Sequence, residues 1–343
     1  MKYKRADIQP AVVFLDTNVI IEMANGIHSG DSAHRGKKVF DALKKAVRSG
    51  KIICPFVHQR DEYARYVHDE VKKELDDILL SLGRGHQVTV RKNIEDAQIQ
   101  RMAVGYLKEG TRFQEFELQK QDIFDPDSHK EPSEAENALG IKIVVLHSGH
   151  IDEDRDVTEP NLLTALINRR AEVRRFELSK EQVYKEESSA VLDDLKKSEK
   201  ERVESYNKIN PNANILHHAS LNLTKKWFLE NWHAALRTVG LSDPEYKKCA
   251  EFIHSEHFLL TPHNVVGTAL YTEIIMSERK IEITDPRDVD ALSLVLPYSE
   301  FVLADSAMRA YIHQSGLNEM FNVHVYALDS WERFLGRLES TYF

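Results

Sequence analysis

The chain has 343 residues, of which 42% are hydrophobic and 29% charged, enough for one large domain or two ordinary ones around a sizeable core. Its formal net charge of −9 argues against high-affinity, non-specific binding of nucleic acid, although a local basic patch can still bind it. The sequence lacks both the apolar stretch of a membrane-spanning helix and the apolar region of a secretory signal. Because Cys54 and Cys249 are the only cysteines, we expect no disulfide framework and a cytoplasmic protein without membrane contact.

The N-terminal part of the chain predicts alternating strands and helices. Residues 11–15 (AVVFL) form a short apolar run that ends at Asp16, as a buried parallel strand does. Apolar residues recur at helical spacing over residues 32–48, and Gly50 follows them. Residues 51–54 predict a second strand and residues 58–82 a second amphipathic helix. This order indicates a parallel α/β fold.

Residues 83–256 differ from the N-terminal part of the chain, because their pattern is mostly helical and their composition is strongly charged. The alternating charges of residues 191–209 are typical of a solvent-exposed helix. Residues 141–146 (IKIVVL) predict either a strand or a buried helical turn, which periodicity does not separate. We therefore expect a large helical insertion in the α/β fold.

Two groups of side chains in the middle of the chain suggest binding sites. Residues 168–175 (NRRAEVRR) are the best basic cluster for a phosphate backbone, but Glu172 and Glu177 favour a solvated helix instead. His254 and His257 have the spacing of a histidine pair on one helix face, which zinc can use, but no third ligand completes a site.

The strand and helix pattern returns near the C-terminus. It predicts helices at 286–296, 306–314 and 331–338 and strands at 300–304 and 322–328. The four predicted strands make a small, doubly wound parallel sheet, in which ligands bind beyond the carboxyl ends of the strands. The predicted domains are residues 1–82 together with 257–343, and the helical insertion 83–256.

Two of the predicted strands end in an aspartate. Asp16 lies in FLDTNVII, where Thr17 and Asn18 can fix the turn by bonds to the backbone, and Asp305 ends EFVLAD. The alternative for Asp16 is a cap on the following helix. Since parallel strands end at one edge of a sheet, both carboxylates are expected there.

A third acidic group lies in DPRDVDALSLVLPY, residues 285–298. Asp285 before Pro286 predicts a helix N-cap. A helical wheel places Asp288 within the apolar arc and turns Asp290, with Ser293, towards solvent. A buried carboxylate needs compensating hydrogen bonds or a cation, so Asp288 is the functional candidate and Asp290 the surface residue.

Carboxylates on one rim repel each other and raise each other's pKa unless cations lie between them. Mg²⁺ and Mn²⁺ are the hard divalent ions that oxygen ligands bind. Two such ions about 4 Å apart activate a water and stabilise the leaving oxygen of a phosphodiester. The rim therefore predicts phosphodiester hydrolysis.

These motifs together resemble the PIN-domain nuclease family, over residues 10–75 and 280–340. The resemblance implies a three-layer α/β/α fold and a four-acid metal site made of Asp16, Glu62, Asp288 and Asp305. Within CPFVHQRDEY, Asp61 is the close alternative to Glu62, and Asp290 competes with Asp288 as a metal ligand. The chain departs from the family at Leu303, where a threonine is usual, and in its long insertion.

The resemblance implies a metal-dependent nuclease, an endoribonuclease that uses Mg²⁺ or Mn²⁺ and prefers RNA to DNA. A catalytically silent PIN-like scaffold or regulatory module, acting through the helical insertion, is the alternative. A phosphotransferase of the haloacid-dehalogenase type would need a second aspartate where Asn18 stands. A regulatory protein partner and homo-oligomerisation are left open by the sequence.

Overall fold

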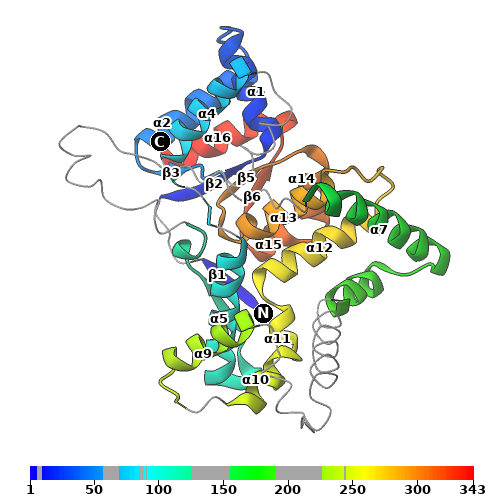
Figure 1. Cartoon of the computed structure of the whole chain (residues 1–343). Helices are drawn as coiled ribbons and strands as arrows, with labels where there is room; N and C mark the ends of the chain where they lie inside the picture. The colour runs from blue at the N-terminus through cyan, green and yellow to red at the C-terminus, as the bar shows by residue number, and fades with distance from the viewer. Residues whose placement is uncertain are drawn as a thin grey trace.

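The computed structural model describes residues 1–5, 10–56, 69–84, 86, 88–89, 91–124, 155–190, 226–242 and 245–343. Four parallel strands form the central sheet in the order β3-β2-β5-β6 (Figure 1). Their bounds are Ala11–Leu15 for β2, Ile52–Ile53 for β3, Phe301–Leu303 for β5 and His324–Tyr326 for β6. The predicted mixed α/β class with a parallel sheet is confirmed, and each strand lies within its predicted range.

Helices cover both faces of this sheet, which explains why β2 is an unbroken apolar run. Val13 and Leu15 on β2 belong to one hydrophobic cluster, whereas Val12 and Phe14 belong to the cluster on the opposite face. All four side chains are buried, because successive residues of a strand point to opposite faces.

The first face is covered by helices from both ends of the chain. They are α1 (Thr17–His28), α2 (Arg35–Arg48), α4 (Asp69–Gly83) and α16 (Trp331–Tyr342). The predicted helix at 32–48 begins at Arg35, because the His34 side chain caps it by accepting a hydrogen bond from Gly36 N at 3.2 Å. The first part of the predicted helix 58–82 lies outside the described residues.

Two glycines allow α1 and α2 to pack closely. A Cβ atom on Gly36 would lie 1.9 Å from the Glu22 carbonyl oxygen, and one on Gly26 would lie 2.5 Å from Lys37 N. Real side chains do not tolerate such distances, so glycine at both positions sets the separation of this helix pair.

The second face is covered by three helices that flank β5, namely α12 (Pro262–Met276), α13 (Asp285–Val295) and α14 (Ser306–Gln314). The same hydrophobic cluster continues into α5 (Arg91–Glu109), α9 (Lys226–Thr238) and α10 (Tyr246–Ile253). Trp232 on α9 stacks on Phe252 of α10 with ring centroids 5.9 Å apart. Among the described residues, one hydrophobic cluster therefore includes side chains from both sides of residues 82 and 257.

A second, two-stranded parallel sheet joins the N-terminal residues to the middle of the chain. β1 (Lys2–Arg5) pairs with β4 (Glu115–Leu118), and the Tyr3 hydroxyl donates to Leu260 O at 2.7 Å. The N-terminal strand thus packs with residues on both sides of the predicted boundary at 257.

Residues 180–190 are also helical, and the remaining named elements are α7 and several short helices. Their bounds are Arg155–Phe176 for α7, Glu256–Leu259 for α11, Leu317–Met320 for α15, Gly110–Arg112 for η1, Lys120–Asp122 for η2, Leu296–Tyr298 for η5 and Leu328–Ser330 for η6. The segments 141–146 and 191–209, for which the sequence predicted a strand or helical turn and a long helix, lie outside the described residues. None of the described helices is long and apolar enough to cross a membrane.

Candidate functional site

The carboxyl edge of the sheet brings Asp16 and Asp305 together. Leu15 pairs with Leu303, and Asp16 N donates to Leu303 O at 2.8 Å. Asp16 therefore lies beside Ala304, one residue from Asp305. A strand spacing of about 4.8 Å and a rise of about 3.3 Å put the two aspartate Cα atoms roughly 6 Å apart.

This edge is also the switch point of the sheet. The chain passes from β2 to β3 on one side and from β5 to β6 on the other, so the order reverses between β2 and β5. Open parallel sheets bind ligands in the crevice outside the carboxyl ends of the two strands at such a point. Asp16 and Asp305 follow those two strands.

Asp16 occupies the N-cap position of α1 without acting as its cap. Its backbone is extended, and its carbonyl accepts hydrogen bonds from Val19 N at 3.0 Å and Ile20 N at 3.2 Å. Its half-buried carboxylate accepts no hydrogen bond from the first-turn amides of α1. The capping role that was the alternative for this side chain is therefore not what the structure shows.

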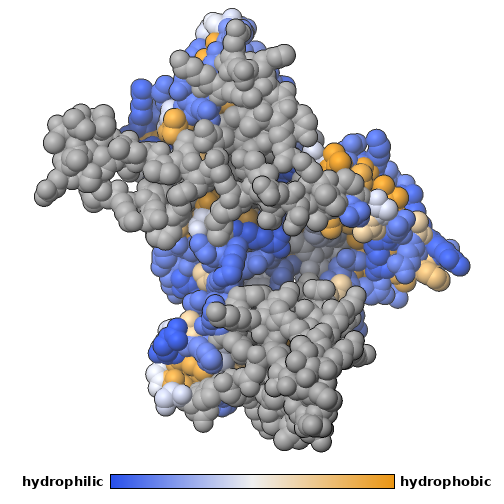
Figure 2. All heavy atoms as spheres, viewed as in Figure 1, coloured by the Kyte–Doolittle hydropathy of each residue, from blue (hydrophilic) through white to orange (hydrophobic). Residues whose placement is uncertain are grey.

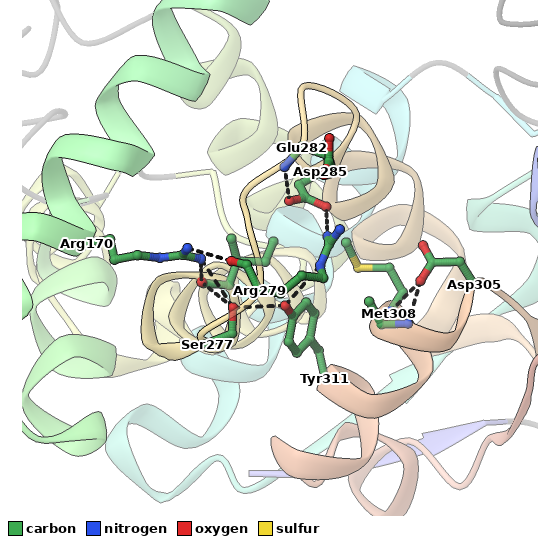
Figure 3. Close-up of polar contacts among 10 residues, drawn as sticks. Arg170, Ser277, Arg279, Glu282, Asp285, Asp305, Met308 and Tyr311 are labelled. Carbon is green, nitrogen blue, oxygen red and sulfur yellow. Dashed lines mark hydrogen bonds and ion pairs between the residues drawn. The ribbon is translucent and has the colours of Figure 1, made fainter.

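Asp305, by contrast, is a helix cap. Its Oδ1 accepts hydrogen bonds from Ala307 N at 2.6 Å and Met308 N at 2.9 Å, at the start of α14 (Figure 3). These two bonds fix the carboxylate at the end of β5. The other oxygen, Oδ2, accepts no hydrogen bond from a described residue and is the atom through which Asp305 can bind a ligand.

The helical wheel was right about the apolar side of α13 and wrong about its opposite side. Val289 and Leu292 are buried and Asp288 is half-buried, as expected. Asp290 and Ser293, however, do not face solvent: Asp290 forms an ion pair with Arg91 of α5, and Ser293 is buried. The wheel assumed one buried face, whereas α13 has packed elements on several sides.

Asp285 is not the N-cap of α13, because the helix begins at Asp285 itself and Thr284 precedes it. Its carboxylate is only 2% exposed, pairs with Arg279, and accepts from Glu282 N at 2.8 Å (Figure 3). The Arg279 guanidinium also lies 3.4 Å from the Tyr311 hydroxyl on α14. Arg279 therefore links the start of the Asp288 helix to the helix that Asp305 caps.

α7 is joined to the same network through Arg170. Its guanidinium donates to Arg279 O at 2.6 Å, to Ile274 O, and to the Ser277 hydroxyl at 3.2 Å (Figure 3). These acceptors lie at and just beyond the end of α12, so Arg170 satisfies carbonyl and hydroxyl groups where that helix ends. The contact is structural and engages both terminal nitrogens of the Arg170 guanidinium with protein groups.

The other arginines of the predicted basic cluster are largely paired. Arg169 forms ion pairs with Glu172, Glu186 and Glu187, and Arg174 pairs with Glu278. Glu172 is a partner as expected. The solvent side of this helix carries the exposed apolar residues Leu162 and Ile167, and Figure 2 shows hydrophobic surface in the region of α7. Residues 168–175 therefore do not offer an open phosphate-binding surface.

His254 and His257 do not share a helix face. α10 ends at Ile253 and α11 begins at Glu256, so the two histidines lie in different elements. His257 is buried, and its Nε2 lies 3.0 Å from Phe113 O. This histidine has a structural partner.

A second polar cluster lies where α5, α12 and α13 meet. Arg91 donates to Glu95 Oε1 at 2.6 Å as well as to Asp290, and His263 Nε2 lies 3.1 Å from the same Glu95 oxygen. Burial raises the pKa of Glu95, but His263 and Arg91 outweigh it and lower that pKa to about 2. The cluster holds α5 against the helix that carries Asp288.

The oxygen donors at the carboxyl edge suit Mg²⁺ or Mn²⁺, because Mg²⁺ is commonly bound by one or two carboxylates together with water and substrate phosphate. Asp16 and Asp305 supply two carboxylates there. Among the described residues, no three histidines, cysteines or acids form a group that could hold a metal ion. Glu62 and Asp61, which the resemblance assigns to the site, lie outside the described residues.

No sequence pattern pointed to Arg91, Arg279 or Tyr311. Arg91 is nearly 200 positions from Asp290, and Tyr311 is 32 from Arg279, so no local pattern joins these pairs. Only the Arg279–Asp285 pair, six residues apart, is close enough in sequence to be guessed as an ion pair. No protein-family model, curated protein or solved structure matches the chain.

Proposed function

We propose that the chain is a metal-dependent nuclease with a PIN-like fold, which hydrolyses phosphodiester bonds in RNA in preference to DNA. The observation that carries the proposal is the position of Asp16 and Asp305 after the two neighbouring strands at the switch point of the sheet. The preference for RNA comes from the resemblance of the sequence motifs to PIN-domain nucleases.

The residues have distinct roles in this proposal. Asp16 and Oδ2 of Asp305 would hold Mg²⁺ or Mn²⁺, with Asp288 and Glu62 completing the donor set. When bound, the metal supplies the charge that activates a water and stabilises the leaving oxygen. Ala307 N and Met308 N orient the Asp305 carboxylate, and Arg279 positions the helix that bears Asp288.

We also propose a cytoplasmic location. Cys54 and Cys249 are both buried and unpaired, which suits a reducing compartment. Burial raises the pKa of the Cys249 thiol to about 12, so this thiol is unreactive at neutral pH.

A catalytically silent PIN-like module is the second candidate function. It is favoured by the lack of a three-ligand metal group among the described residues. In this case the carboxyl edge would be inert, and the chain would act through surfaces of residues 83–256.

A nuclease assay distinguishes the two functions. Labelled single-stranded and structured RNAs, and DNAs of the same sequence, are incubated with the chain and Mg²⁺ or Mn²⁺. We expect cleavage of RNA that EDTA abolishes, that Asp16→Asn abolishes, and that Asp290→Asn retains in the folded protein. Cleavage unaffected by Asp16→Asn contradicts the proposed site, and no cleavage of any substrate favours the silent module.

A further inference from the structure

α2 and the turn after it form a strongly basic segment of an acidic chain. Residues 35–51 contain seven lysines and arginines but a single acid, Asp41. The net charge of −9 is therefore +6 in this segment and −15 in the rest of the chain. Positive charge at this density attracts a polyanion even where the whole molecule is acidic.

Four of these basic residues form one exposed row, which we call the α2 stripe: Arg35, Lys38, Lys45 and Arg48. Their spacing of three, seven and three residues keeps them on one side of the helix. Within the stripe, Arg35 is paired with Glu22 of α1 at 2.6 Å. The row is roughly 20 Å long, from the rise of about 1.5 Å per residue.

α16 lies beside α2 and places aromatic rings next to two lysines of the stripe. Lys38 Nζ is 5.4 Å from the centre of the Trp331 ring, and Lys45 Nζ is 4.0 Å from that of Phe343. A lysine ammonium over an aromatic ring keeps its positive charge, while its side chain loses some conformational freedom. Neither lysine forms an ion pair with a described carboxylate, so both charges are available to a ligand.

The stripe leads towards the candidate site. α2 connects through a short turn to β3, which is parallel to β2, so α2 runs opposite to the strands (Figure 1). Its Arg35 end therefore lies on the side of the carboxyl edge, where Asp16 and Asp305 are found. The Arg48 end lies on the side of the amino edge.

The packing of α2 argues against a membrane as the ligand. Basic amphipathic helices bind bilayers by burying their apolar face among the lipids. The apolar face of α2, including Val39, Leu43 and Val47, is already buried in the protein core. What remains is the hydrophilic side, visible around α2 in Figure 2, which can make only polar contacts.

We propose that the α2 stripe binds the phosphate backbone of a nucleic acid and directs it towards the carboxyl edge of the sheet. This inference rests on the proposed function, because the nuclease activity identifies the polyanion as a nucleic acid. Phosphates pair with lysine and arginine in a way that depends on charge and is independent of base sequence.

Binding is measured in the Asp16→Asn background, so that binding is observed without hydrolysis. The probes are a labelled oligouridylate, a labelled oligothymidylate of equal length, and vesicles of equal parts phosphatidylcholine and phosphatidylserine. The stripe variant is Lys38→Gln, Lys45→Gln and Arg48→Gln, and circular dichroism checks that it is folded. The matched control removes the same charge from α7 and the segment after it, through Arg174→Gln, Arg175→Gln and Lys185→Gln.

We expect the stripe variant to bind oligouridylate about 100-fold more weakly in about 0.1 M salt, because three contacts at a slope of about 0.7 each are lost. The slope of log affinity against log salt should fall by about 2, and the control should bind like the parent. Whether the parent chain binds oligouridylate more tightly than oligothymidylate or binds the two equally, the result supports the stripe, and the comparison reports its preference between RNA and DNA.

Three results would overturn the inference: unchanged binding by the folded stripe variant, an equal loss in the control, or vesicles as the only probe whose binding depends on the stripe. A cleavage assay on chains that keep Asp16 distinguishes failure of the stripe inference from failure of the proposed nuclease function. Stripe-dependent binding without any cleavage supports the stripe and contradicts the nuclease. Cleavage that persists in a chain with the three stripe substitutions and an intact Asp16 supports the nuclease and contradicts the stripe.

Discussion

Gly36 of α2 lies directly against the backbone of Glu22 on α1, where a Cβ atom would be 1.9 Å from the Glu22 carbonyl oxygen. We predict that Gly36→Ala pushes the two helices apart and lowers the free energy of unfolding by about 2 kcal/mol. Urea denaturation measures the loss. Gly336→Ala on α16, where nothing lies within 4 Å of the new Cβ, is the control. It should stabilise the helix by about 0.5 to 1 kcal/mol, and an equal loss in both variants would contradict the packing argument.

Asp305 combines a structural and a chemical role, which two substitutions separate. Asp305→Asn keeps an oxygen for Ala307 N and Met308 N. The charge that it removes repels Asp16 but also interacts favourably with the N-terminus of α14, so the two effects largely cancel, and stability should change by less than about 0.5 kcal/mol while cleavage is lost. Asp305→Ala also removes the cap and should cost about 1 kcal/mol. Thermal denaturation and the RNA cleavage assay give the two readouts. Full activity in Asp305→Asn would mean that this carboxylate is only a cap.

Removing one charge from the carboxyl edge should stabilise the metal-free protein. Asp16 and Asp305 lie close together on the sheet edge, and like charges at this distance repel. We expect Asp16→Asn to raise the unfolding free energy of the metal-free protein by about 1 kcal/mol. Mn²⁺ should then raise the Tm of the unsubstituted chain much more than that of the variant, since only ligands of the folded state stabilise it. A lower Tm in metal-free Asp16→Asn would contradict the repulsion.

Glu95 should contribute an acid-sensitive part of the stability. Its pKa is lowered to about 2 in the folded chain from 4.5, so its contribution is complete above pH 4.5 and is lost as the pH falls towards 2. The shift corresponds to a loss on the order of 3 kcal/mol. Glu95→Gln should therefore be destabilised at pH 7, and the gap from the unsubstituted chain should shrink between pH 4.5 and 2. Glu109→Gln, at the exposed end of the same helix, should leave the pH profile unchanged.

The ion pair between the buried Asp285 carboxylate and the partly exposed Arg279 should show strong energetic coupling. Arg279→Met leaves the buried Asp285 carboxylate without its cation and should cost about 3 kcal/mol of unfolding free energy. Asp285→Asn in the same chain removes the uncompensated charge and should recover more than half of that loss. A double-mutant cycle by chemical denaturation measures this coupling. Additive losses would show that the two side chains act independently.

Local sequence patterns predicted the sheet edge but not its surroundings. The apolar runs that end at Asp16 and Asp305 were sufficient to place both aspartates, because a buried parallel strand has a short-range signature. The Arg91–Asp290 contact joins α5 to α13 across most of the chain, and periodicity carries no information about such a pairing. The wheel placed Ser293 in solvent because it treats a helix as having one partner. In the structure, Ser293 lies in an unbroken run of buried residues from Leu292 to Ser299.

The packing of residues 83–256 was equally beyond the reach of the sequence. Their charged, helical pattern predicted a helical insertion, and α5 and α9 of this segment contribute Met102 and Trp232 to the hydrophobic cluster that also contains Phe14 of β2. Composition records how polar a segment is, whereas the partner of its apolar face is fixed only in three dimensions. The extent of the core therefore became visible only in the structure.

The pairing of β2 with β5 has a consequence for how the chain folds. Leu15 and Leu303 are about 290 residues apart, so the centre of the sheet closes only after a very long loop has lost its freedom. Until β5 has been synthesised, the edge of β2 that it covers has no native partner, and such strand edges promote aggregation. We expect slow folding with a late step in which the two central strands meet. The same step brings Asp16 next to Asp305, so the candidate site is assembled only when the chain is almost completely folded.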